Sequence, residues 1–143
     1  MFDPAAAGAL GPLALHHVAI VVRDLATARE RYAALGFPLP HAEEVADQRV
    51  LVETFALATG YVELIQPTDP DGPIARFLDK RGEGLHHVAY EVDDLARALR
   101  DLAARGVRLI DERPRRGAHG WNVAFVHPEA CAGVLTELVE EPQ

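Results

Sequence analysis

The sequence predicts an α+β fold made of duplicated βαβββ modules that form one curved mixed sheet with an open cleft. Two observations support this prediction. The stretches 15–39 and 85–109 align without a gap and are identical at more than half of their positions. Each stretch is also followed by two further segments rich in β-branched and aromatic residues, as strands are. A repeat of this kind indicates that one architecture occurs twice within a single structural domain.

Each copy begins with an apolar strand headed by the same pentapeptide, Leu-His-His-Val-Ala. Asp24 and Asp94 follow, where a helix is expected to begin. Gly36 and Gly106 stand where a left-handed C-cap would end that helix, and the next strand starts after them. Further strands are predicted at Val50–Leu57 and Tyr61–Gln66 in the first module, and at Trp121–Val126 and Val134–Val139 in the second.

The chain divides into four segments. A flexible leader is expected at 1–14, because this stretch has neither the basic region nor the apolar run of a signal peptide or anchor. The first module spans 15–66 and the second spans 85–140. The linker at 67–84 is rich in Pro, Asp and Gly at both ends, and a short helix is expected at Ile74–Leu78 in its middle.

The composition excludes several classes of function. Hydrophobic residues make up 49% and charged residues 25% of the 143 residues, as in soluble globular proteins. The net charge of -8 argues against nucleic acid as a partner, and no apolar run is long enough to cross a membrane. Cys131 is the only cysteine, which excludes an internal disulfide and fits the cytoplasm.

The paired histidines are expected to lie on opposite faces of their strands, because side chains alternate across a strand. His16 and His86 share a face with bulky apolar residues, which should pack on the following helix. They are interpreted as core histidines or as residues that support a site. His17 and His87 share a face with small residues, where an open sheet could hold a ligand.

The last strand of each module adds a carboxylate within an apolar run, Glu63 in the first and Glu137 in the second. A carboxylate in a buried strand is costly unless it is paired or bound to a metal. A lone strand histidine is more often a core residue, and a lone strand glutamate more often faces solvent. The repeat relates all four residues, however, and therefore favours a divalent metal such as Co, Zn, Ni, Mn or Fe.

The other histidines, His41, His119 and His127, are interpreted as loop residues. Clustered basic residues suggest a local positive patch that could bind an anionic small molecule, although ordinary solvated charge explains each of them equally well. These residues are Arg76, Lys80, Arg81, Arg113, Arg115 and Arg116.

The duplicated pattern with its four candidate ligands resembles the vicinal oxygen chelate superfamily from Leu15 to Glu140. Within that superfamily, the methylmalonyl-CoA epimerases are the most similar family. The segments that carry this resemblance are Pro73–Ala89, Gly117–Gly120, His127-Pro128 and Gly133–Leu138.

The resemblance implies an isomerase that interconverts 2R- and 2S-methylmalonyl-CoA through an enolate, aided by a divalent metal, and it implies a homodimer. A metal ion acts here as a Lewis acid toward the developing negative oxygen. Inversion also needs a base on each side of the enolate plane. Glu137 matches a family position that is both ligand and base, and is expected to be one of the two.

The second base is open between two glutamates. The family places a glutamate on the strand at Val50–Leu57, but an ungapped comparison puts Val52 there, with Glu53 one residue away. A one-residue shift moves a side chain to the other face of the sheet. Either a bulge restores Glu53, or the base is Glu63; Glu53 could also be an ordinary exposed residue.

For the CoA moiety, the resemblance directs attention to Lys80 and Arg81 beside the linker helix and to Arg113, Arg115 and Arg116, because phosphates favour such clusters. Backbone amides of the loop Gly117-Ala118-His119-Gly120 could approach the acyl group.

Three other functions are compatible with parts of the pattern. A lactoylglutathione lyase (glyoxalase) would use the same four ligands. A ring-cleaving dioxygenase would use two histidines and one carboxylate, which leaves Glu63 without a role. A ligand-sequestering module of the same fold would need no metal at all.

Overall fold

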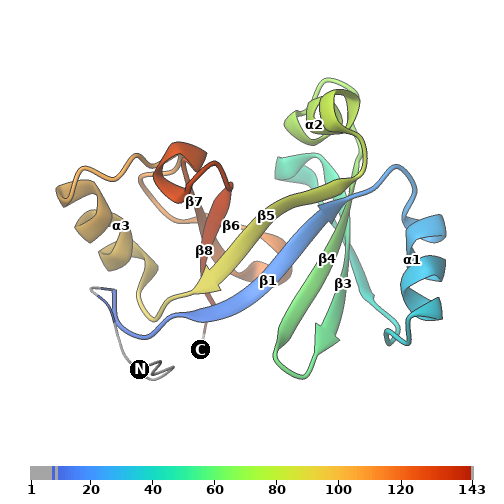
Figure 1. Ribbon diagram of the computed structural model, residues 1–143, viewed down its shortest axis with the longest axis horizontal. Coiled ribbons are helices and arrows are strands. Elements are labelled where there is room, and N and C mark those ends of the chain that lie inside the picture. Colours follow the sequence, from blue (N-terminus) through green and yellow to red (C-terminus); the bar gives the residue numbers. More distant parts are fainter. Residues whose placement is uncertain (1–7, 9, 143) are drawn as a thin grey trace. The chain divides into compact units, whose positions relative to one another are not determined.

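The computed structural model of the protein describes residue 8 and residues 10–142. Most of the leader expected at 1–14 lies outside the described residues. Strands and α-helices follow one another in the order expected for two βαβββ modules joined by a helical linker (Figure 1). They are β1 (Ala14–Val21), α1 (Leu25–Ala34), β2 (His41–Val45), β3 (Val50–Leu57), β4 (Gly60–Pro67), α2 (Pro73–Arg81), β5 (Gly84–Glu91), α3 (Leu95–Ala104), β6 (Arg115–Arg116), β7 (Asn122–Val126) and β8 (Thr136–Glu140).

The chain forms two compact units, which are described separately. The first unit comprises residues 17–87, and the second comprises the remaining described residues. In the first unit the strand order is β2-β3-β4-β1. β1 runs parallel to β4, whereas β2, β3 and β4 are antiparallel neighbours. The parallel pair is possible because the intervening α1 provides the crossover that parallel strands require.

Helix α1 covers the face of the first sheet that carries the bulky side chains. Asp24 caps the helix, accepting a hydrogen bond from the Thr27 backbone N–H at 3.1 Å. Val18 and Ile20 of β1 pack on this side, with Phe55 fully buried at the centre. The predicted orientation of the bulky face is therefore confirmed. The other face buries a smaller cluster, Ala19, Val50, Val52 and Ile65.

The second unit repeats the design, with the strand order β5-β8-β7-β6 and β5 parallel to β8. The division falls within β5, so that His86 and His87 belong to the first unit and the strand from Val88 onward belongs to the second. Asp94 caps α3 as Asp24 caps α1, with its acceptor 3.1 Å from the Arg97 backbone N–H. α3 packs through Leu95 and Leu99 against the sheet residues Ala124, Val126 and Leu138. The α+β class and the duplicated βαβββ architecture are confirmed.

The expected elements and the observed ones differ in a few places. The linker helix is longer than expected, at Pro73–Arg81. The final strand begins at Thr136 rather than Val134, because the Val134 N–H bonds back to the Cys131 carbonyl in a turn. The loop assignment of His41 is wrong, since His41 opens β2 and pairs with Thr54. Over the described part of the chain, none of the helices has the length and apolar character needed to span a membrane.

Candidate metal centre

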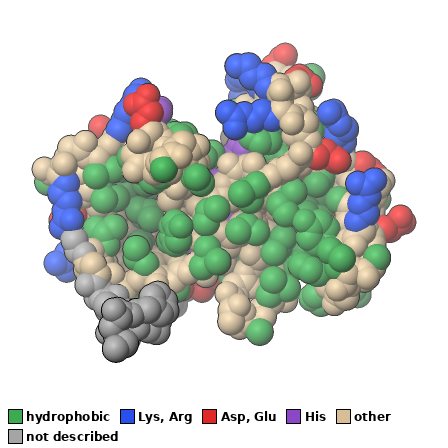
Figure 2. Space-filling model, viewed as in Figure 1, with side chains coloured by type: hydrophobic (Ala, Val, Ile, Leu, Met, Phe, Trp, Pro, Cys, Tyr) green, Lys and Arg blue, Asp and Glu red, His purple; other side chains and the backbone are tan. Residues whose placement is uncertain are grey.

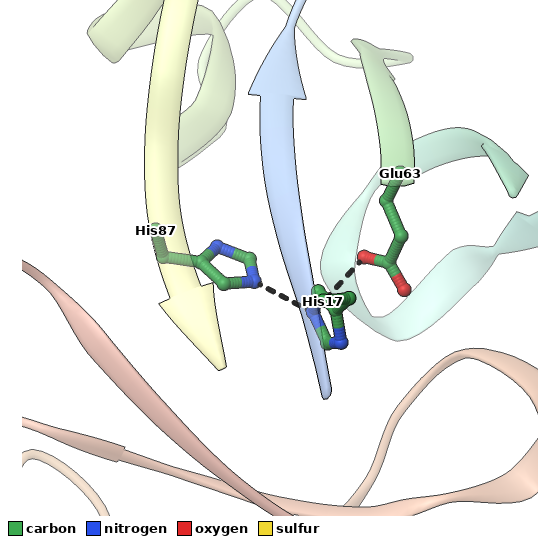
Figure 3. Close-up of side chains that lie close together, drawn as sticks. All are labelled: His17, Glu63 and His87. Carbon is green, nitrogen blue, oxygen red and sulfur yellow. Dashed lines mark hydrogen bonds and ion pairs between the residues drawn. The ribbon is translucent and has the colours of Figure 1, made fainter. Parts of the chain in front are cut away.

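Three buried side chains of the first unit meet on one face of its sheet: His17 of β1, Glu63 of β4 and His87 of β5 (Figure 3). They are 2%, 6% and 4% exposed, respectively. The Nε2 atoms of His17 and His87 are 3.2 Å apart. The Nε2 atom of His17 lies 3.5 Å from the Oε1 atom of Glu63. The structure thus brings together three of the four predicted ligands.

These separations fit a single bound ion. Two ligand atoms at about 2.0 to 2.1 Å from a metal, with an angle of about 90° to 109° between the bonds, lie about 2.8 to 3.4 Å apart. The observed 3.2 Å between the two imidazole nitrogens lies within that span, and the 3.5 Å between His17 and Glu63 lies about 0.1 Å beyond it. Two imidazole nitrogens and one carboxylate oxygen are the donors that divalent transition metals prefer. The residues present therefore fit a divalent metal.

The electrostatics of the site also favour a metal over protonated histidines. Burial lowers the pKa of His17, against the opposing effect of the Glu63 carboxylate. Burial lowers the pKa of His87 well below its ordinary value, and the neighbouring His17 and His86 act in the same direction. Both imidazoles are neutral near pH 7, and a neutral imidazole has the lone pair that binds a metal ion.

Glu53 lies on the face opposite to these ligands. The register of β3 with β4 continues without a bulge, placing Thr54 opposite Glu63 and Glu53 opposite Leu64. Oε1 of Glu53 accepts from Nε of Arg29 at 2.7 Å and lies 2.6 Å from its Nη2. The bulge considered for Glu53 is therefore not formed, and at 3% exposure the exposed alternative is wrong too.

The Arg29–Glu53 pair provides a test of this placement. Within the described part of the chain, Oε2 of Glu53 is buried without a hydrogen-bond partner, so the carboxylate depends on Arg29 alone. Arg29→Met should lower the free energy of unfolding by about 2 to 3 kcal/mol, because it leaves a buried charge uncompensated. Urea denaturation of the metal-free protein measures the change. The double variant Arg29→Met/Glu53→Leu should recover most of the loss; a single variant as stable as the wild type would contradict the assignment.

The fourth predicted ligand, Glu137, belongs to the second unit. It lies on β8, opposite Ala89 of β5, in the same register that places Glu63 opposite Ala19 of β1. Burial raises the pKa of Glu137 to about 8, with Arg115 lowering it and Asp111 raising it further. A carboxyl group with this pKa exchanges protons readily near neutral pH.

The raised pKa of Glu137 predicts a pH-dependent stability in the absence of metal. The folded state holds the Glu137 proton more tightly than the unfolded chain, whose carboxyl has a pKa near 4.5. The stabilisation is therefore complete below pH 4.5 and is lost as the pH rises through about 8. Glu137→Gln should become progressively more stable than the wild type between pH 5 and 9. Urea melts in the presence of a chelator check this, and parallel pH profiles would refute it.

The basic residues predicted to bind substrate fall in different units. Lys80 and Arg81 form the exposed last turn of α2 in the first unit, and the guanidinium of Arg81 lies 5.7 Å from the centre of the Phe77 ring. Figure 2 shows basic side chains gathered over α2. In the second unit, Arg113 is exposed, and Arg115 and Arg116 form the exposed strand β6.

The predicted glycine loop directly follows β6 and forms a 3₁₀ turn over Ala118–Gly120. The backbone N–H of Gly117 donates to the Trp121 carbonyl at 2.9 Å. Gly117 packs closely on Val123, where a Cβ atom would lie only 3.1 Å from the valine methyl groups. His119 adopts a positive φ of 57° within the turn. The loop is therefore tightly constrained by its backbone hydrogen bond to Trp121 and by its packing on Val123.

The two remaining histidines of the repeated pentapeptide have different partners. In the second unit, Nε2 of His16 lies 3.0 Å from Oε1 of Glu141, and its ring meets the Trp121 ring edge-on. In the first unit, Nδ1 of His86 lies 2.9 Å from Nδ1 of His87. Strand alternation does not predict the contact between His86 and the predicted ligand His87. The only feature of the sequence that points to this contact is the doubled histidine itself.

Comparison with known proteins agrees with this architecture. The family model described as the Glyoxalase/Bleomycin resistance protein/Dioxygenase superfamily matches residues 16–125. The chain belongs to this superfamily, the vicinal oxygen chelate proteins, and the resemblance predicted from the sequence is confirmed.

Several of the similar proteins within this superfamily are methylmalonyl-CoA epimerases. The chain is 41% identical over 130 residues to the mitochondrial methylmalonyl-CoA epimerase of Bos taurus, covering 87% of this chain and 72% of the relative. A crystal structure of methylmalonyl-CoA epimerase from Mycobacterium tuberculosis superposes with a TM-score of 0.86 at 41% identity, covering 91% of this chain and 89% of that one. A methylmalonyl-CoA epimerase in complex with methylmalonyl-CoA and NH4+ gives a TM-score of 0.85 at 35% identity, over 90% and 94% of the two chains.

Proposed function

We propose that this protein is an epimerase that interconverts 2R- and 2S-methylmalonyl-CoA by metal-assisted proton exchange at C2. The observation that carries the proposal is the His17–Glu63–His87 donor set, spaced for one divalent ion. It occurs in a chain that is 41% identical to a methylmalonyl-CoA epimerase. The carbon between a thioester and a carboxylate is a weak acid, and the site contains groups suited to removing its proton.

The reaction divides into two proton transfers. When bound, a divalent cation supplies a Lewis acid that stabilises the negative oxygen of the enolate. One carboxylate takes the C2 proton as the C–H bond breaks. A carboxylic acid on the other face delivers a proton to C2 as the enolate returns to the thioester, which inverts the centre.

Glu137 is proposed as one of these groups and Glu63 as the other. The pKa of Glu137, raised by burial to about 8, lets it serve as carboxylate or as carboxylic acid near neutral pH. Glu63 is favoured over Glu53 because it shares the sheet face of His17, whereas Glu53 is paired with Arg29 on the other face.

The full ligand set is proposed to be His17, Glu63, His87 and Glu137. The support for Glu137 is its equivalent register within the repeat, opposite Ala89. Nitrogen and oxygen donors suit Co, Zn, Ni or Mn. Lys80, Arg81 and Arg116 are proposed to meet CoA phosphates, and the Gly117–Gly120 loop the acyl group; the exposure of these cations supports the assignment. A homodimer in the cytoplasm is proposed from the family resemblance and the single cysteine.

A paired assay tests the function against its nearest rival. With Co²⁺ added, the protein should convert 2R-methylmalonyl-CoA into an equal mixture of both epimers. Chiral separation of the products measures this conversion. It should leave the hemithioacetal of methylglyoxal and glutathione unchanged. Turnover of the hemithioacetal, with no change in methylmalonyl-CoA, would replace the epimerase by a lactoylglutathione lyase.

A further inference from the structure

Three imidazoles of the first unit form a continuous chain of close nitrogen contacts. Nδ1 of His86 lies 2.9 Å from Nδ1 of His87, and Nε2 of His87 lies 3.2 Å from Nε2 of His17. The proposed epimerase uses His87 and His17 as metal ligands, but it assigns no function to His86. Its ring is held edge-on against Phe77 of α2, with the ring centres 4.9 Å apart.

The direction of the protons along this chain is restricted. A neutral imidazole carries one N–H, so His87 donates through either Nδ1 or Nε2 but not both. If Nε2 binds a metal, it carries no proton, and the single N–H must be on Nδ1. Nδ1 of His87 then donates to Nδ1 of His86, whose own proton is on Nε2.

We infer that His86 is a positioning residue for the metal centre: it accepts the Nδ1–H of His87 and so directs the Nε2 lone pair of His87 toward the ion, while Phe77 holds the His86 ring in place. Metal-binding histidines generally donate their second N–H to a fixed acceptor, which selects the tautomer and the ring orientation. The inference rests on the metal site of the proposed function, but not on the substrate or the reaction.

Two substitutions at His86 separate an acceptor role from a packing role. Asn places its side-chain oxygen close to the position of the His Nδ1 atom and can accept the same hydrogen bond, whereas Leu fills similar space without an acceptor. The affinity for Co²⁺, followed by visible absorption, should fall about 10- to 100-fold in His86→Leu and stay within a few-fold of the wild type in His86→Asn. Equal losses in both variants, or wild-type affinity in His86→Leu, would overturn the inference.

A second measurement uses the unmodified protein and so remains informative if a variant fails to fold. In Zn²⁺-loaded, ¹⁵N-histidine-labelled protein, imidazole NMR should find His87 protonated at Nδ1 and His86 protonated at Nε2. A proton on Nδ1 of His86 would overturn the inference. Both readouts are independent of turnover, so they can succeed even if methylmalonyl-CoA proves not to be the substrate.

Discussion

Replacing His87 by alanine is expected to abolish stoichiometric Co²⁺ binding and to slow proton exchange at C2 of methylmalonyl-CoA by at least about 1000-fold. The Lewis-acid contribution of a bound metal is worth several kcal/mol to the transition state, and each 1.4 kcal/mol is a factor of about ten in rate. His87 is buried beside His17, and its removal takes away one of the two imidazole nitrogens of the site. Equilibrium dialysis and an exchange assay on the same preparation measure both effects.

A histidine of the second unit supplies the matched control. His127 lies in a turn, where its side chain accepts a hydrogen bond from the Glu129 backbone N–H at 3.1 Å. His127→Ala should bind Co²⁺ like the wild type. If His87→Ala also bound one equivalent of Co²⁺ with unchanged affinity, the ion would have to be held elsewhere and the assigned centre would be wrong.

The second large effect concerns Glu137. Glu137→Gln keeps a side-chain oxygen but removes the acid–base group, and should slow epimerisation by about 100- to 10,000-fold. Because inversion requires one base on each face, the remaining carboxylate should still remove a proton from one epimer and return deuterium to the same face. We therefore expect exchange without inversion from one epimer, observed by mass and by chiral separation in deuterated water.

Two comparisons make this expectation specific. Glu63→Gln should show the same behaviour toward the opposite epimer, because Glu63 is proposed as the base on the other face. Glu129→Gln changes an exposed carboxylate paired with Arg108 and should leave the rate unchanged. A Glu137→Gln variant that inverts either epimer at the wild-type rate would exclude Glu137 as a base.

Much of the fold could be predicted because the duplication presents each strand, helix-start and helix-end pattern of the sequence twice. Each strand–helix repeat has an aspartate at the start of its helix, Asp24 in the first and Asp94 in the second. Both aspartates cap their helices by accepting a backbone N–H. The sequence predicts the linker helix at Ile74–Leu78, but the observed helix α2 is longer, at Pro73–Arg81. Its last turn contains Lys80 and Arg81, charged residues that are equally typical of an exposed linker. His41 was misjudged because its strand is specified by pairing with β3, which is not visible in local composition.

The site was predictable to the extent that strand alternation determines it. His17, Glu63 and His87 share a sheet face by their parity and register, and the repeat related them. Glu53 was harder, because its partner Arg29 lies on a helix 24 positions earlier and only the folded structure shows the pairing. Alternation also assigned His86 to the opposite face, but Nδ1 lies close to the backbone, so adjacent imidazoles can still meet.

Metal-assisted epimerisation is tested by proton exchange at C2 of methylmalonyl-CoA in deuterated water with Co²⁺, comparing the purified protein with His17→Ala. The wild type should incorporate deuterium, and the incorporation should be lost on adding a chelator and be absent in the variant. A wild-type protein that holds one equivalent of Co²⁺ but incorporates no deuterium would contradict the epimerase while leaving the metal centre intact.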